Sequence, residues 1–423
     1  MRSVKNLIPA WLKGPVWYRL ERRNKITLGP DTKIFSNGKF GTPGRRKLVL
    51  AGHEATRTGA PLILLELAKN FSSNEDLELL LFLERGGPLV SEYAKFCTVI
   101  INNNYFYKIG QPRVADLIHE ISEPRPVSAI VNSAETWRLS QQLHESGLFI
   151  ISLIHENMAR YQNEALDSIL DNSARIIFPA EALKQVAINT RTTFDRSEVL
   201  PQGLLRPNFG QRDKYAAILE VRNQLNISQE KPIVLACGTR DLRKGFDIFH
   251  QVARAVIAEN IVRPHFLWLG GSTSRRIMDR VSVDYWLSWD KEVLDLGNDI
   301  SHIDEVPDPE LFFLAADAFI LTSRDDPFPC VVHEAMSAKL PVIAFDRAGG
   351  SAEALADGAG IIVPYLDVTA MANAVTTIIL ERANANEMID RAEKRVRQTY
   401  NFENYASKIR NMLHEAEVQH PNP

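Results

Sequence analysis

The chain has 423 residues, of which 45% are hydrophobic and 24% charged, and its formal net charge is -3. This length is too great for one ordinary hydrophobic core and predicts two domains, with three as the alternative. The composition is that of an ordinary soluble protein, and the charge balance excludes a protein whose whole surface grips nucleic acid.

The first 45 residues are predicted to be a basic extension, residues 1–45. Its first 25 residues hold seven lysines and arginines against one glutamate. Trp11 and Trp17, set among these cations, suit contact with an anionic membrane surface. Pro9 and Pro15 break any long helix and favour a poorly ordered basic leader instead. Both interpretations stay open.

The three cysteines, Cys97, Cys237 and Cys330, are far apart and form no CxxC pair. This usage predicts a reducing compartment with no disulfide framework and no zinc site. No apolar run approaches the roughly 18 residues of a membrane span, and none forms a signal-peptide core. We expect a cytoplasmic protein. Because of the basic extension, peripheral association with the inner face of the membrane stays an alternative.

From residue 46 onward, short apolar runs alternate with helix-like segments. The first cycle is a strand over 47–54, a helix over 59–71 and a strand over 77–84. Further strands are expected at 127–132, 148–156 and 174–179. Such alternation predicts βαβ units and a parallel sheet. The Pro- and Gly-rich stretch 200–211 marks the end of this first domain.

The alternation restarts after this boundary. Strands are expected at 232–238, 265–271, 318–323, 341–346 and 360–365, with helices such as 245–258 and 370–382 between them. We therefore predict an α/β protein with two Rossmann-like domains, 46–205 and 206–395, facing across a ligand-binding cleft. Residues 396–423 are expected to form a helix that packs back on the first domain, followed by a tail.

A basic loop follows one predicted strand in "ACGTRDLRKGFDIF", residues 236–249. The strand ends at Gly238, and Arg240, Arg243 and Lys244 precede the expected helix. Close backbone approach, free helix N–H groups and cations suit a diphosphate, although a solvated basic turn has the same composition. The loop has neither GxxxxGK[ST] nor GxGxxG spacing, which disfavours a P-loop enzyme and an ordinary dinucleotide-binding oxidoreductase.

A second glycine turn, Gly349 and Gly350, follows the strand 341–346 and offers another anion-facing backbone. A plain helix-capping turn explains it nearly as well. Between the two turns lies "DDPFPCVVHEAM", residues 325–336. Asp326 is either a site carboxylate or the N-cap of the next helix. Glu334 lies in an otherwise apolar helix and needs hydrogen-bond donors, which a ribose diol would supply.

Together these segments resemble the retaining family 4 glycosyltransferases of the GT-B fold. That family has an acid-x7-Glu motif, an apolar "EAM" helix, a "PV(I/V)A" strand and a Gly-Gly-x-x-Glu turn. Here the series is Asp326, Glu334 to Met336, Pro341 to Ala344, and Gly349 to Glu353. The resemblance extends over most of residues 47–410. The chain departs from it where Asp326 replaces the usual glutamate, Pro329 a glycine and Lys339 a helix-ending glycine. In the basic loop, Thr239 stands where an arginine often follows the glycine, and Arg240 comes one position later.

The resemblance implies a role for each matching residue. Lys244, with Arg240 or Arg243, would hold the nucleotide diphosphate, and Glu334 would bind the ribose. Asp326 would face the hydroxyls of the donor sugar. The backbone at Gly238, Phe328, Cys330, Val331, Gly349 and Gly350 would complete the donor site.

The first domain would contribute the acceptor side. The turn "TRTGAP", residues 56–61, places Gly59 opposite the diphosphate and the acceptor. In "LIHE", residues 153–156, His155 would lie near the transferred sugar, with Glu156 beside it on the acceptor side.

The implied function is transfer of a hexose, with retention, from a nucleotide-diphosphate sugar to a glycan or lipid-linked acceptor in cell-envelope polysaccharide synthesis. The sequence has no DxD triplet, so we expect neither a metal nor another cofactor, with the nucleotide sugar as a substrate. No nucleic-acid partner is expected. Two alternatives stay open: a nucleotide-sugar epimerase or hydrolase on the same fold, and a catalytically silent subunit that binds a nucleotide sugar.

Overall fold

A computed structural model describes residues 33–36, 45–102, 114, 117–118, 126–190, 196–272 and 283–419. The predictions for the tryptophan-rich basic segment and for the last residues of the tail lie outside this part of the chain. The chain forms two compact units. Unit 1 contains the residues up to Pro179, Leu183–Leu200 and the chain from Glu403, and unit 2 contains Ala180–Ala182 and Pro201–Phe402.

Unit 1 is built on an eight-stranded sheet with the order β1-β4-β3-β2-β5-β6-β7-β8. The strands are β1 (Lys33–Phe35), β2 (Arg46–Gly52), β3 (Leu77–Leu83), β4 (Thr98–Ile101), β5 (Ser128–Asn132), β6 (Phe149–Leu153), β7 (Arg175–Phe178) and β8 (Ser197–Val199). The pairs from β4 to β8 are parallel, as the strand and helix alternation predicted. Strand β2 is buried from Lys47 to Gly52, as is typical of a parallel strand covered on both faces.

The edge strand β1 pairs antiparallel with β4, with Ile34 opposite Ile100. This strand falls inside the segment 1–45 that we expected to be only an extension. That expectation was wrong for Lys33–Phe35, because three residues are enough to add a strand to a sheet whose edge is already formed.

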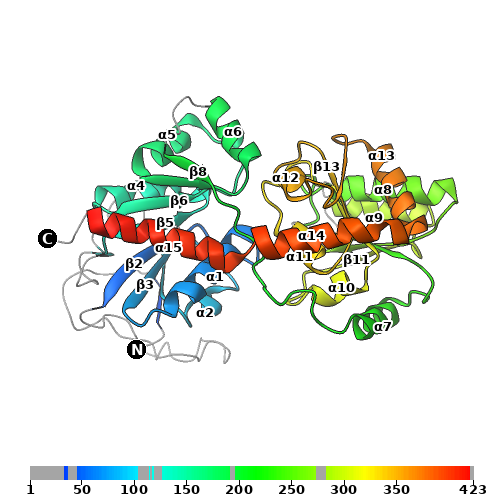
Figure 1. The fold of residues 1–423 in the computed structure, drawn as a ribbon, viewed down its shortest axis with the longest axis horizontal. Helices are drawn as coiled ribbons and strands as arrows, with labels where there is room; N and C mark the ends of the chain where they lie inside the picture. Colours follow the sequence, from blue (N-terminus) through cyan, green and yellow to red (C-terminus); the bar gives the residue numbers. More distant parts are fainter. Residues whose placement is uncertain are drawn as a thin grey trace, which may run out of the picture. The chain divides into compact units, whose positions relative to one another are not determined.

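The connections of unit 1 are α1 (Gly59–Ser72), α2 (Val90–Tyr93), η4 (Ala134–Thr136), α4 (Trp137–Glu145), η5 (Met158–Arg160), α5 (Asn163–Asn172) and α6 (Glu181–Thr190). The last helix of the chain, α15 (Phe402–Gln419), drawn in red in Figure 1, also belongs to unit 1 from Glu403 onward. Its buried side chains are Tyr405, Ala406, Ile409 and Leu413. Unit 1 is therefore completed by the two ends of the described chain.

Unit 2 has a six-stranded parallel sheet with the order β11-β10-β9-β12-β13-β14. The strands are β9 (Ile233–Cys237), β10 (His265–Leu269), β11 (Ile300–Ile303), β12 (Ala318–Leu321), β13 (Val342–Phe345) and β14 (Ile361–Val363). The connections are α7 (Lys214–Leu225), α8 (Phe246–Glu259), α9 (Val283–Val293), α10 (Glu310–Ala315), α11 (Cys330–Ser337), α12 (Ser351–Ala354), α13 (Val368–Leu380), η6 (Arg382–Ala385) and α14 (Asn386–Thr399).

The core of unit 2 lies between this sheet and the helices α8 and α13. Phe246 and Phe249 of α8 both pack against Trp268 of β10, with ring centroids 4.9 and 5.2 Å apart. These large buried rings fix the start of α8 beneath the ends of β9 and β10. The helix therefore presents its first turn at the carboxyl edge of the sheet.

The middle strands of unit 2 are β9, β12 and β13, and they are neighbours in the order β9-β12-β13. Because parallel strands end at the same edge, the loops that follow them lie side by side. In open α/β sheets this edge is where ligands bind. Among the described helices, none combines the length and the apolarity needed to cross a membrane.

Candidate functional site

A lysine and an aspartate from two of these loops meet in unit 2. The Lys244 Nζ, after β9, donates to Asp326 Oδ2, after β12, at 2.6 Å. The same oxygen accepts from the Ser323 hydroxyl at 3.2 Å. Asp326 is only 5% exposed, so these donors stabilise a carboxylate that has little access to water.

The alternative role of Asp326 as a helix cap was wrong. The helix α11 begins at Cys330, and its N-cap residue is Pro329, with no side-chain capping bond. The carboxylate of Asp326 is used by Lys244 and Ser323 instead. The Pro327-Phe328-Pro329 turn accounts for this, because its three residues separate the aspartate from the first turn of the helix.

Two glycines hold the backbone around this ion pair. At Gly245, φ is +72°, and a Cβ atom would lie 1.8 Å from the Thr322 carbonyl oxygen. At Gly349, φ is +122°, and a Cβ atom would lie 2.0 Å from the Asp326 carbonyl oxygen. Both positions require glycine, because a side chain would clash with backbone in a conformation that L-residues disfavour. The three loops are thus packed backbone against backbone.

The two arginines of the basic loop do not point at Asp326. Arg243 donates from its Nη1 to the Asp325 carbonyl oxygen at 3.0 Å. Arg240 donates from its Nε to the Gly270 carbonyl oxygen at 2.8 Å, and its guanidinium also pairs with Asp304 and Asp284. The diphosphate role expected for Arg240 stays a prediction. In the structure, the guanidinium braces the ends of β10 and β11.

Glu334 lies in α11, and its side chain is 13% exposed. Its Oε1 accepts a hydrogen bond of 2.7 Å from Nη2 of Arg206, a residue of the segment between β8 and α7. Burial raises the pKa of Glu334, while the charge and the hydrogen bond of Arg206 act in the opposite direction. The donor that this acid was predicted to need is therefore supplied, in part, by the protein.

The other residues expected on the donor side lie along the same loops. Gly238 directly follows β9, and a Cβ atom there would contact the Lys244 side chain at 3.4 Å. Cys330 and Val331 form the first turn of α11, and Gly350 precedes α12. Phe328 contributes differently, because its ring is buried against His333 and Tyr400, with ring centroids 4.8 and 5.7 Å away.

The charged groups also act on the two thiols in this part of unit 2. Burial raises the pKa of Cys237 to about 12, and the nearby charges that contribute are Glu334, Lys244, Arg206 and Asp326. Burial likewise raises the pKa of Cys330 to about 12. Both thiols are therefore protonated at neutral pH and serve as neutral lining rather than as nucleophiles.

In unit 1, His155 follows β6, and its Nε2 lies 2.9 Å from Oδ1 of Asn132, the last residue of β5. Burial and the neighbouring His53 lower the pKa of His155 to about 4, so the imidazole is neutral at pH 7. His53 directly follows β2. Since the sheet order is β2-β5-β6, these three polar side chains mark one row along the carboxyl edge of unit 1.

Glu156 has contacts that differ from those expected of an acceptor-side residue. Its carboxylate accepts from the Ser133 hydroxyl at 2.5 Å, from the Ala134 N–H at 2.8 Å and from the His155 N–H at 3.1 Å. These bonds hold together the turns that follow β5 and β6. Gly59 is the first residue of α1, and nothing lies within 4 Å of a Cβ atom built there. Its surroundings are open, so no steric contact requires glycine at this position.

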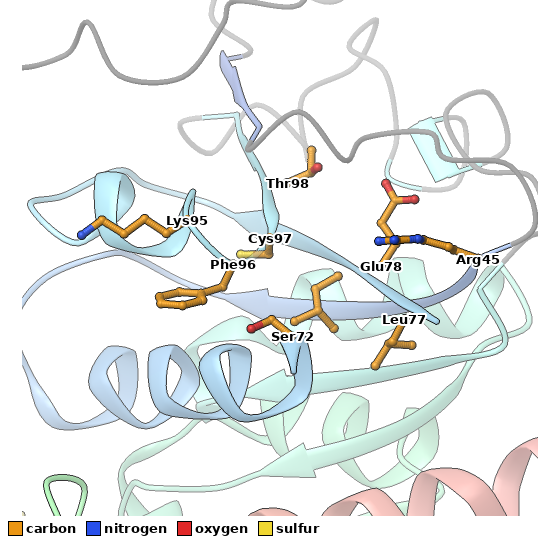
Figure 2. A pocket seen from close by; sticks show the side chains of 9 residues that line it. Arg45, Ser72, Leu77, Glu78, Lys95, Phe96, Cys97 and Thr98 are labelled. Atoms are coloured by element: carbon orange, nitrogen blue, oxygen red, sulfur yellow. The ribbon is translucent and has the colours of Figure 1, made fainter. Parts of the chain in front are cut away.

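A small hollow of unit 1 lies away from this edge (Figure 2). It has a volume of about 70 Å³ and is lined at the amino ends of β3 and β4 by residues such as Leu77, Glu78 and Thr98. A nucleotide sugar needs several hundred Å³. The hollow therefore has neither the size nor the position of a donor site.

Residues 218–395, which lie in unit 2, match the family model described as "Glycosyl transferases group 1". The lipopolysaccharide core biosynthesis mannosyltransferase LpcC of Rhizobium leguminosarum bv. viciae is 29% identical over 168 residues, or 40% of this chain. The match covers 46% of the length of LpcC, less than half of that protein.

Solved structures resemble a much larger share of the chain. Anabaena HepE in complex with UDP and glucose matches with a TM-score of 0.75 and 19% identity, over 88% of this chain and 100% of that one. Sucrose-phosphate synthase of Thermosynechococcus elongatus matches with a TM-score of 0.68 and 18% identity, over 89% and 100%. The chain has the GT-B fold. The family model, in turn, falls on the GT-B unit that carries Lys244, Asp326 and Glu334.

Arg206 is the principal site residue that the sequence did not reveal. It lies 128 positions from Glu334 in the chain, inside a Pro- and Gly-rich segment that had been interpreted only as a domain boundary. A cation in a boundary segment gives no local signal of its partner. Among the described residues, no group of three or more His, Cys, Asp or Glu side chains is placed to hold a metal ion.

Proposed function

We propose that this protein is a glycosyltransferase that moves a hexose from a nucleotide-diphosphate sugar to a glycan or lipid-linked acceptor, with retention at the anomeric carbon. The observation that carries the proposal is the Lys244–Asp326 pair at the carboxyl edge of unit 2, with Glu334 on the helix α11 that follows, inside the region that matches the glycosyl transferases group 1 model. The order of these residues in the motif supports a donor site.

In the proposed site, the ammonium of Lys244 neutralises charge that develops on the leaving diphosphate. Arg243, on the same loop, is a second candidate for this role. Positive groups that are fixed before the reaction stabilise such a transition state without needing to reorganise. Because the sequence contains no DxD triplet, we assign this stabilisation to side-chain cations and helix N-termini rather than to a metal ion.

Asp326 and Glu334 have separate proposed roles. Asp326 accepts from hydroxyls of the donor sugar, and Glu334 accepts from the ribose. The neutral imidazole of His155 belongs to the acceptor-side unit and lies at the carboxyl end of a strand, where a hydroxyl of the transferred sugar could be bound. We also propose that the acceptor is a component of a cell-envelope polysaccharide. The name of the relative LpcC, a lipopolysaccharide core mannosyltransferase, supports this choice.

The test is a thermal-shift screen of the full chain with UDP, GDP and ADP and with their common sugars, UDP-glucose and GDP-mannose among them. A ligand present at 100 times its dissociation constant should stabilise the fold by about 2.7 kcal/mol. Lys244→Ala and Glu334→Ala should each weaken that binding at least tenfold, as expected for a lost charge-assisted contact. Wild-type affinity in both variants would refute the site.

The reaction class is tested by measuring nucleoside diphosphate release with and without a panel of lipopolysaccharide-core and lipid-linked acceptors. A transferase releases the diphosphate at a rate that depends on the acceptor. Acceptor-independent release would indicate a hydrolase, and conversion of the sugar without release would indicate an epimerase. Tight binding with no turnover across the panel would indicate a silent subunit.

A further inference from the structure

Arg206 is held on unit 2 from several sides. Its Nη2 donates to Glu334 Oε1 at 2.7 Å, and its Nη1 lies 3.5 Å from an oxygen of Asp308. The guanidinium carbon lies 4.5 Å from the centre of the Phe209 ring, in a cation–π contact. A planar guanidinium fixed by a carboxylate and an aromatic face retains little rotational freedom.

The segment that carries Arg206 is itself fastened to unit 2. The Gly210 N–H donates to Glu310 Oε1 at 2.7 Å, and the Ser337 hydroxyl donates to the Phe209 carbonyl oxygen at the same distance. The Phe209 ring also packs edge-on against Phe313, with centroids 5.3 Å apart. These bonds join the segment to α10 and α11, so Arg206 approaches Glu334 from a rigid base.

The groups around Glu334 shift the pKa of its carboxyl in opposite directions. The groups that act on this carboxyl are burial and Asp308, which favour its protonated form, and Arg206, which favours the ionised form. The neighbouring thiols of Cys237 and Cys330 are neutral at physiological pH. Among the described residues, Arg206 is the cation that forms a hydrogen bond with Glu334, and this bond uses one of the two carboxylate oxygens, Oε1.

From this arrangement we infer that Arg206 is a positioning residue, which orients the Glu334 carboxylate toward the ribose hydroxyls of the donor nucleotide. The inference rests on the proposed function, because it requires that Glu334 bind a ribose. The segment between β8 and α7 that carries Arg206 then takes part in discriminating ribonucleotides from nucleotides that lack the diol.

The test measures dissociation constants by calorimetry for the nucleoside diphosphate, among UDP, GDP and ADP, that the wild-type chain binds most tightly, and for its 2′,3′-dideoxy form. In Arg206→Met, the affinity for the ribonucleotide should fall at least tenfold, while that for the dideoxynucleotide should change less than threefold. Arg206→Lys should recover part of the loss, since it keeps the charge without the planar fork.

Arg212→Met is the matched control. Arg212 lies in the same segment and pairs with Asp308 at 2.5 Å and Glu310 at 3.0 Å, but not with Glu334. A purely structural effect of losing an arginine from this segment would appear equally in both variants. We expect Arg212→Met to weaken the binding of both nucleotides by the same factor, no more than threefold.

The pH dependence gives a second readout. Without Arg206, the pKa of Glu334 should rise further, so ribonucleotide affinity in Arg206→Met should decline as the pH falls from 8 to 6, more steeply than in the wild type. Equal losses for the ribonucleotide and the dideoxynucleotide would overturn the inference, as would wild-type affinity in Arg206→Met. If the wild-type chain bound none of the three diphosphates, both the proposed function and the inference about Arg206 would fail.

Discussion

Replacing Lys244 by Met should destabilise unit 2 even without a ligand. The Lys244 and Asp326 side chains are 17% and 8% exposed, and the variant would leave the aspartate with the Ser323 hydroxyl as its remaining side-chain donor among the contacts described. Removing one partner of a buried ion pair typically costs about 3–5 kcal/mol. We therefore expect a loss of about 3 kcal/mol.

The measurement is urea unfolding of the full chain, followed by tryptophan fluorescence and circular dichroism, with the transitions of the two units fitted separately. The double variant Lys244→Met/Asp326→Asn removes both charges and should recover most of the loss, to within about 1 kcal/mol of the wild type. Its nucleoside diphosphate affinity should stay at least tenfold below that of the wild type. Stability and binding would thus separate.

Lys231→Met provides the comparison. The Lys231 Nζ also lies 2.6 Å from a buried aspartate, Asp299, but Arg263 bonds the same carboxylate at 2.8 Å. Because a second cation remains, this variant should lose about 1 kcal/mol or less and should bind nucleotide normally. If Lys244→Met were no more destabilising than Lys231→Met, or if the double variant recovered nucleotide affinity, the reasoning would be refuted.

Two further predictions concern stability. His333 is 1% exposed, and burial lowers its pKa to about 3, so the unfolded chain takes up a proton below pH 6.5 that the folded chain refuses. Stability is therefore lost as the pH falls, and His333→Leu should reduce the loss between pH 7 and 5 by about 2 kcal/mol in urea titrations; an unchanged loss would contradict this. Gly245→Ala should lower the free energy of unfolding by at least about 3 kcal/mol, because it forces Thr322 to move. Gly297→Ala, with nothing within 4 Å of its Cβ, should cost under about 1 kcal/mol. Similar melting temperatures for the two variants would disprove the contrast.

The fold was largely predictable because the apolar runs of a parallel sheet are continuous and their spacing is regular. The strands β9, β12 and β13 fall within the predicted runs, and this alternation predicted two Rossmann-like sheets, whereas the GT-B fold was implied by the family resemblance. The strand β1 could not be predicted in the same way. Three residues carry no periodicity, and this strand forms only because β4 offers it an edge.

The candidate site was predictable in its composition and less so in its contacts. The motif spacing placed Lys244, Asp326 and Glu334 in one unit, and the structure pairs Lys244 with Asp326 while Arg206 bonds Glu334. The sequence did not reveal that Lys244 pairs with Asp326. Nor did it reveal that Arg240 forms ion pairs with Asp304 and Asp284, because these pairs join loops that are distant in the chain. Such pairing is decided by packing and leaves no local pattern.

The return of α15 to unit 1 affects the order in which the protein can mature during synthesis. Chains emerge from the ribosome amino end first, and domains usually fold as they appear. Unit 2 ends at Phe402, so it can close before the last helix is made. Unit 1 begins first, but the surface that Ile409 and Leu413 cover stays exposed until those residues have been translated. A nascent chain stalled before residue 403 should therefore hold a folded unit 2 and a unit 1 that still needs a chaperone.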